Sequence, residues 1–129
     1  MTGDEEAVLA ANDAFYAAFE ARSLGRMDEV WEHGQDVVCT HPGWGTLVGW
    51  PDVRASWAAL LDNEEHLQFI VTDARVAVRS GVGFVSASEN LLTGGGPQGS
   101  VAVLNVFARQ PDSSWRMVVH HGSPVLRPR

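Results

Sequence analysis

Apolar side chains recur at steps of three and four residues between Asp4 and Ala21, which is the spacing of one face of an α-helix. Thr2 or Asp4 can accept hydrogen bonds from the free N–H groups at the start of this helix. The acidic run Asp4-Glu5-Glu6 also suits the positive end of the helix dipole. We therefore predict an amphipathic helix over residues 4–21, with a buried stripe formed by Val8, Ala11, Phe15, Ala18 and Phe19.

Two later stretches repeat the helical spacing. Ser23 is a suitable N-cap for a short second helix, and Gly34 is a suitable stop. The inward residues of this helix are Met27, Val30 and Trp31. A third helix is predicted to open at Trp50-Pro51-Asp52, because proline is well tolerated in a first turn. Its stripe consists of Val53, Trp57, Leu60 and Leu61.

The other segments have a strand-like pattern. A β-branched run over 36–41 ends at Pro42, and the glycine-rich segment 42–49 is predicted to be a loop. After Asn63, four β-rich stretches follow at about 67–79, 83–92, 100–109 and 115–126. Turn sequences at 80–81, 94–97 and 111–114 join them, so neighbouring strands should pair antiparallel. The order ααβαββββ predicts an α+β fold, in which three helices pack on one face of a curved antiparallel sheet.

Composition restricts the class of protein. The chain has 129 residues, 45% hydrophobic and 19% charged, which is typical of one globular domain spanning 1–129. Its net charge is −7 and all nine cations are arginine, so neither nucleic acid nor an anionic membrane is an expected partner. The N-terminus is acidic rather than signal-like, and no apolar run approaches the ~20 residues of a membrane span. We expect a cytoplasmic protein.

His41 is the first candidate for chemistry, because it ends a predicted strand just before the glycine-rich loop. Histidine titrates near neutral pH and can act as a general base or acid. The alternative interpretation is a strand-end histidine whose hydrogen bond only fixes the loop. The single cysteine, Cys39, shares a strand face with His41 and is expected to be a packing residue.

The pair His120-His121 is the second candidate. Neighbouring strand residues point to opposite faces, so only one of the two can enter a cavity. The alternation that contains His121 (Trp115, Met117, Val119) is the more apolar, which favours His121. A metal site would need His41, one of this pair and a third ligand such as Glu89, but the spacing matches no recognised metal motif. We predict no metal.

Polar residues inside apolar strands indicate a cavity. Glu89 and Asn105 need hydrogen-bond partners if they are buried, and a bound ligand or water supplies them; otherwise these residues face solvent or a subunit interface. Trp44 and Trp57 can form aromatic walls for a small apolar ligand, although core packing against the sheet is the favoured interpretation for Trp57. One face of the strand over 100–109 is wholly apolar (Ala102, Leu104, Val106, Ala108), and the opposite face is largely so, which favours a partner subunit.

Together these segments resemble the nuclear-transport-factor-2-like superfamily, and more narrowly its SnoaL-like and ketosteroid-isomerase-like branch. The resemblance lies in the segments 15–19, 41–44, 47–50, 56–57 and 115–123. It implies a cone-shaped curved sheet closed by helices around an apolar pocket, and a homodimer formed through the sheet. His41 stands where the isomerases carry their proton-transferring aspartate, while Tyr16 lies one residue beyond the place of their oxyanion-hole tyrosine.

We therefore predict a protein that binds a small apolar or ring-containing molecule and acts without an organic cofactor, as an isomerase, cyclase or dehydratase. His41 and His121 are the predicted catalytic residues. The predicted ligand-binding residues are Tyr16, Trp44, Trp57, Glu89 and Asn105. The alternative is a non-catalytic association or ligand-carrier domain, in which the histidines and tryptophans serve folding and the sheet serves dimerisation.

Overall fold

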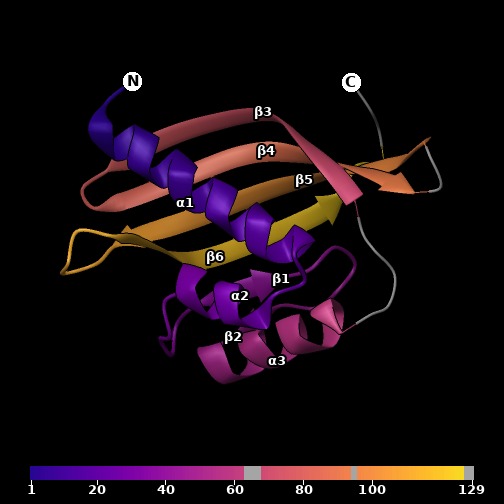
Figure 1. Cartoon of the computed structure of the whole chain (residues 1–129), viewed down its shortest axis with the longest axis horizontal. Coiled ribbons are helices and arrows are strands. Elements are labelled where there is room, and N and C mark those ends of the chain that lie inside the picture. Colours follow the sequence, from indigo (N-terminus) through magenta and orange to yellow (C-terminus); the bar gives the residue numbers. More distant parts are fainter. Residues whose placement is uncertain (63–67, 94–95, 127–129) are drawn as a thin grey trace.

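Three helices precede most of the sheet, as the computed structural model shows (Figure 1). The structure describes residues 1–62, 68–93 and 96–126. Helix α1 spans Gly3–Glu20, and Thr2 and Glu5 form a reciprocal capping box at its start. Helix α2 spans Leu24–Val30, with Ser23 as its N-cap. Helix α3 spans Trp50–Leu61, with proline in its first turn. All three predicted helices are confirmed, although α2 ends before Gly34.

Six strands form one sheet in the order β2-β1-β6-β5-β4-β3. Their bounds are β1 Val38–Thr40, β2 Leu47–Val48, β3 Gln68–Arg79, β4 Val82–Thr93, β5 Gly96–Arg109 and β6 Trp115–Pro124. Strands β3 to β6 form the predicted antiparallel meander. The predicted glycine turn lies partly outside the described residues, since 94–95 are among those not described.

Two features of the sheet differ from the prediction. Strand β1 pairs with β6 in parallel, so the sheet is mixed rather than antiparallel. Strand β2 lies inside the segment predicted to be a loop and pairs antiparallel with β1. No local turn joins β1 to β6, so their relative direction depends on how the helices and the meander are packed. A two-residue strand surrounded by glycines likewise has too little pattern to be predicted.

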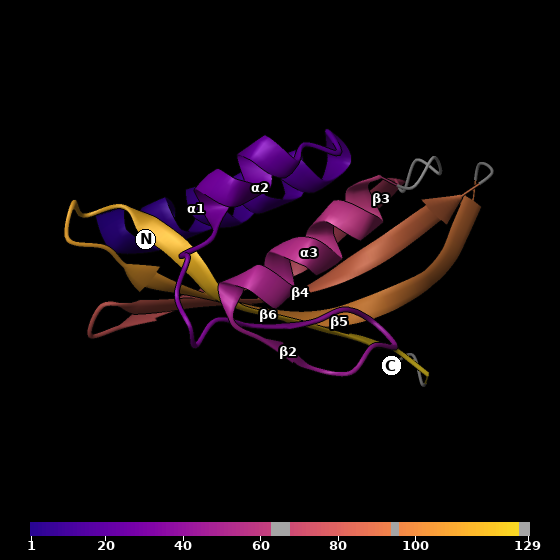
Figure 2. The ribbon, with the colours of Figure 1, turned by 90° about the horizontal axis from the view of Figure 1, so that it is seen from below.

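The helices all lie on one side of the sheet (Figure 2). The sheet is curved and does not close on itself, and the far ends of β4 and β5 bend toward the helices. Among the described residues no helix covers the other side. We call the helix-covered side the inner face and the other side the outer face. The predicted α+β fold is confirmed with this mixed sheet.

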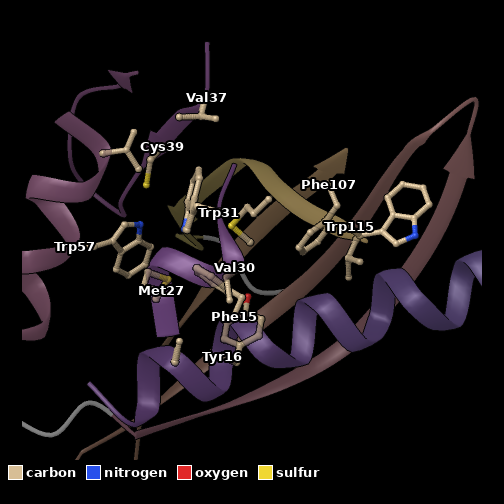
Figure 3. Packing of buried hydrophobic residues seen from close by; sticks show 14 of the residues in the cluster. Phe15, Tyr16, Met27, Val30, Trp31, Val37, Cys39, Trp57, Phe107 and Trp115 are labelled. Carbon is tan, nitrogen blue, oxygen red and sulfur yellow. The ribbon is translucent and has the colours of Figure 1, made fainter. Parts of the chain in front are cut away.

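The core lies between the helices and the inner face, where large side chains are fully buried (Figure 3). Phe15 of α1 makes edge-to-face contacts with Tyr16 and Trp57, with ring centroids 4.9 and 5.4 Å apart. Helix α1 approaches β4 at Gly83, where an added Cβ would lie 2.5 Å from a Val8 methyl carbon. The absence of a side chain at Gly83 therefore allows this close packing.

A bulge in β6 exchanges the faces of its two histidines. Phe107 pairs with Met117 and Val106 pairs with Val119, so Val118 is an extra residue with no partner on β5. Met117 is buried on one side of the bulge, and His120 is buried on the other. His121 is exposed on the outer face. The expectation that His121 points into a cavity is therefore wrong, because it assumed unbroken alternation along the strand.

Candidate functional site

A cavity of about 200 Å³ opens between the helices and the inner face. It is lined by residues of two helices (α1 and α3), of strands β3 to β6 and of the loop after β1. Most of them are apolar: Phe19, Pro42, Trp44, Leu60, Phe69, Leu91 and Val101. Among the described residues, its polar lining consists of three titratable side chains. These are His41, Glu89 and His120, which are 2%, 5% and 1% exposed. The cavity thus collects three ionisable groups in an otherwise hydrocarbon environment.

His41 follows β1 directly and is held from α3. Its Nε2 lies 2.8 Å from the Ser56 Oγ, and that hydroxyl donates to the Val53 carbonyl at 2.6 Å. The rings of Trp57 and Trp44 pack edge-to-face against the imidazole, with centroids 4.7 and 4.9 Å away. Burial lowers the pKa of His41 to about 4, so the imidazole is neutral near pH 7. A neutral imidazole of this kind can accept a proton.

Glu89 reaches the cavity from β4 and is held by Tyr16 of α1. The Tyr16 hydroxyl donates to the Glu89 Oε2 at 2.8 Å. Burial raises the pKa of Glu89, and the bond from Tyr16 only partly offsets it. Burial and the nearby Glu89 together raise the pKa of Tyr16. Glu89 is therefore displaced toward its protonated form, while Tyr16 stays a phenol that is already engaged with the carboxyl group.

Asn105 of β5 lies at the centre of a buried polar network. Its Nδ2 donates to the Asn12 Oδ1 at 2.8 Å and to the Tyr16 Oη at 3.2 Å. Its Oδ1 lies 2.6 Å from the His120 Nδ1. Burial, with smaller contributions from the neighbouring histidines, lowers the pKa of His120 to about 3. The network thus connects α1 to the two strands that carry His120 and Glu89.

The structure brings most of the predicted residues together. His41, Trp44 and Glu89 line the cavity, whereas Tyr16 and Asn105 lie behind it and contact lining residues through hydrogen bonds. Trp44 is 44% exposed at the lining. Trp57 is fully buried behind His41 and does not line the cavity, as the core interpretation predicted.

Three residues of the network were absent from the predicted site. Ser56 lies on the apolar stripe of α3, one turn after Val53, and Asn12 lies on that of α1, one turn after Val8. A polar residue within an apolar stripe was the signal in the sequence that could have identified both. His120 was placed on the wrong face because the bulge has no sequence signature. Cys39 lies 3.6 Å from the His41 Nε2, and burial raises the pKa of its thiol to about 12, which suits packing rather than nucleophilic chemistry.

Other features carry no comparable chemistry. A larger hollow of about 410 Å³ lies over α1 and α2, but its charged lining residues, Arg26 and Glu29, are exposed. Within residues 1–62, 68–93 and 96–126, no three histidine, cysteine or acidic side chains converge as metal ligands do. In the same part of the chain, no helix has the length and apolar character needed to cross a membrane. We therefore take the smaller, buried cavity as the candidate site.

Comparison with known proteins agrees with this architecture. Residues 8–127 match the SnoaL-like domain. The chain belongs to the SnoaL-like family. A solved structure from Streptomyces avermitilis, provisionally named a dehydratase of the NTF2-like family, is 38% identical over 96% of this chain and 97% of its own, with a TM-score of 0.86. The resemblance to this branch of the superfamily is thereby confirmed.

Two further relatives show how varied the family is. A structure from Thiobacillus denitrificans, provisionally named a calcium/calmodulin-dependent protein kinase type II association domain, is 36% identical, covers 90% of this chain and 93% of its own, and has a TM-score of 0.83. The F-box protein SKIP8 of Arabidopsis thaliana is 28% identical over 93% of this SnoaL-like chain. The chain spans 50% of that plant protein. Membership in the family therefore leaves the choice between catalysis and association to the site itself.

Proposed function

We propose that this SnoaL-like protein binds a small ring-containing molecule in the cavity and transfers a proton on it, with His41 as the general base and Glu89 as the general acid. One observation carries the proposal. In a single apolar cavity, burial displaces His41 toward a neutral base and Glu89 toward a neutral acid. Titratable groups whose pKa values are pushed in opposite directions are the usual mark of acid–base assignments.

The volume of the cavity limits the size of the molecule. A dry protein cavity of about 150 Å³ holds one benzene molecule. A cavity of about 200 Å³ therefore accommodates one substituted six-membered ring, and a four-ring steroid would need the walls to open. This favours a monocyclic substrate over the steroids implied by the name of the isomerase branch.

The proposed reaction needs no organic cofactor. His41 takes a proton from a carbon next to a carbonyl group, and Glu89 gives its proton to the carbonyl oxygen, so the substrate becomes an enol. In an isomerisation of an unsaturated ketone, His41 returns its proton to the far carbon of the conjugated dienol while the enol proton goes back to Glu89. In a dehydration, the His41 proton leaves with a hydroxyl group on the next carbon as water, and the enol proton again goes back to Glu89. Of the pair His120-His121, His120 is the residue that lines the cavity, so it takes the position that the sequence prediction assigned to His121. A positioned general base or acid, such as His41 or Glu89 here, contributes about 10²–10⁴-fold to a rate.

Exchange of carbon-bound protons tests this function directly. Cyclohexanone in D2O is a single-ring probe whose α-protons are lost from the ¹H NMR spectrum as they exchange. We expect the protein to accelerate this loss, and His41→Ala to reduce the acceleration by about 10²-fold or more. His33→Ala is the matched control, since His33 is exposed beside Trp50 and away from the cavity lining. A His41→Ala variant that folds and retains the full acceleration would exclude His41 as the base.

A second candidate function is self-association through the outer face. Ile70 and Leu104 are 54% and 41% exposed there, and Ala102 on the same face of β5 is also exposed. An apolar sheet surface without a covering helix is typical of an interface. We propose a homodimer through this surface, which would accommodate either catalysis or a carrier role. Light scattering after size exclusion at micromolar concentration tests it, and a monomer would contradict it.

A further inference from the structure

The hydrogen bonds around His41 determine which ring nitrogen carries the proton. The Ser56 hydroxyl has one proton, and it is donated to the Val53 carbonyl. Toward His41, Ser56 can therefore only accept, so the proton of the neutral imidazole lies on Nε2. The other nitrogen, Nδ1, has only the Cys39 sulfur within reach at 3.9 Å, and a thiol is a weak donor at this distance. Within the described part of the chain, the Nδ1 lone pair thus has no strong donor.

The same reasoning applied to His120 gives the opposite tautomer. Both amide protons of Asn105 are used, one toward Asn12 and one toward Tyr16. The Asn105 Oδ1 therefore accepts from His120, whose proton must lie on Nδ1. The Nε2 of His120 makes no hydrogen bond to the part of the chain that the structure describes. Each histidine thus directs its proton into the protein and keeps a lone pair for another donor.

The rest of the lining determines what kind of donor would fit. The two imidazole rings are 6.3 Å apart, centroid to centroid, and border the same cavity. No arginine is among the described lining residues, so nothing there would balance the charge of a carboxylate or a phosphate. An uncharged hydroxyl group could donate to one of the free nitrogens at no such cost, while the ring that carries it contacts the aromatic and aliphatic walls.

We infer that the cavity selects neutral single-ring molecules that carry a hydroxyl group, and that Ser56 and Asn105 set this selectivity as positioning residues by fixing the tautomers of His41 and His120. The inference rests on the proposed function in that it concerns the same cavity. It does not require turnover, because the selectivity lies in binding. Hydroxylated monocycles are a narrower class of molecule than the family or the proposed proton transfer specifies.

Three small molecules of similar shape test the selectivity. Phenol has the hydroxyl donor, toluene lacks it, and benzoate is charged. By titration followed by NMR, we expect phenol to bind at least tenfold more tightly than toluene, and benzoate to bind more weakly than either. Asn105→Ala should reduce the preference for phenol severalfold, whereas Asn90→Ala should leave it unchanged, since Asn90 bonds to Ile70, Thr72 and Ser100 and does not line the cavity.

Nitrogen-15 NMR of the histidine rings tests the tautomers themselves. Near pH 7 we expect His41 to be protonated on Nε2 and His120 on Nδ1. Asn105→Ala should move the His120 proton toward Nε2, and Ser56→Ala should relax the tautomer of His41 while leaving His120 unchanged. Because the two variants act on different histidines, loss of folding in one leaves the other as a test. A wild-type His120 protonated on Nε2 would overturn the inference.

The outcomes separate the inference from the proposed function. Equal binding of phenol and toluene overturns the inference alone. A preference for phenol without any exchange of cyclohexanone protons supports the inference and contradicts the catalytic proposal. If neither phenol nor toluene binds, the inference is overturned, and the catalytic proposal stands or falls with the exchange of cyclohexanone protons.

Discussion

The inner and outer faces of the sheet are built from the same strands, yet their polar residues differ in kind. On β5 and β6, Asn105 and His120 are buried on the inner face and joined by a hydrogen bond of 2.6 Å. Their chain neighbours Leu104 and His121 pair with each other on the outer face and are exposed. The comparison teaches that the fold, rather than the residue type, buries one of two adjacent histidines in a hydrogen-bonded network and leaves the other exposed.

The largest contrast between the faces is expected in stability. Phe107→Ala removes a fully buried ring from the inner face and should lower the free energy of unfolding by about 3–5 kcal/mol. Val82→Ala on β4, where the side chain is 42% exposed, should cost less than about 1 kcal/mol. Urea denaturation of both variants measures the difference. Equal losses would mean that the outer face is as well packed as the inner one, for example by a second subunit.

Acid should destabilise the protein through the two histidines that are buried on the inner face. The folded-state pKa values of His41 and His120, about 4 and about 3, lie below the ordinary value near 6.5. The unfolded chain therefore binds more protons between about pH 6.5 and pH 4, and stability falls as the pH falls through this window. The raised pKa of Glu89 acts in the opposite direction, lowering stability as the pH rises past the ordinary glutamate range.

Substitution of His120 checks this pH dependence. Between pH 7 and pH 4.5, His120→Gln should lose about 2 kcal/mol less stability than the wild-type protein, because one buried titrating group is gone. Thermal or urea unfolding at several pH values gives both slopes. Identical slopes for His120→Gln and wild type would show that His120 titrates as a solvated side chain.

The polar network should respond more than an equivalent pair on the other face. Asn105→Ala removes the hydrogen-bond partner of the Asn12 Oδ1 and of the His120 Nδ1 and leaves Tyr16 only its bond to Glu89, so it should cost about 1–3 kcal/mol. Asn90→Ala removes bonds that water can replace, because Asn90 is only half-buried, and should cost about 0.5–1 kcal/mol. Equilibrium unfolding of the two variants measures the gap. If Asn105→Ala lowered the unfolding free energy no more than Asn90→Ala does, the network would not be needed to hold His120 in place.

The smallest effect on folding, and the largest on assembly, is expected at Leu104. Leu104→Asp places a charge on the outer face and should change the unfolding free energy of the isolated subunit by less than about 0.5 kcal/mol. If the outer face joins two subunits, the same change should convert the dimer to a monomer, as measured by light scattering. Binding of phenol should persist in the monomer, since Leu104 does not line the cavity. If Leu104→Asp abolished both the dimer and the binding of phenol, the cavity would depend on the subunit contact at the outer face.

The sequence predicted the elements of this fold better than their pairing. The stripe from Val8 to Phe19 and the alternation in 100–109 are local patterns, and α1 and β5 follow them closely. The parallel pairing of β1 with β6 depends on chain segments far apart, and β2 is too short to carry a pattern. Local periodicity therefore sufficed for the meander and the helices, but not for the sheet edge.

The candidate site was predictable where a polar residue interrupted an apolar pattern. Glu89 and Asn105 stand out in strands that otherwise bury hydrocarbon, and both are buried as that argument requires. Ser56 and Asn12 interrupt helical stripes in the same way and could have been found by the same rule. His120 could not, because an extra residue such as Val118 leaves no trace in composition or periodicity.

Trp44 gives the cavity a built-in optical reporter. Of the five tryptophans, Trp44 is the one that lines the cavity and is also widely exposed, while Trp31 and Trp57 are fully buried. Indole emission depends on the polarity around the ring, so a molecule that displaces water from the cavity should shift the emission of Trp44 and leave that of the buried rings unchanged. The difference between the spectra of the wild-type protein and Trp44→Phe would then report occupancy without any label.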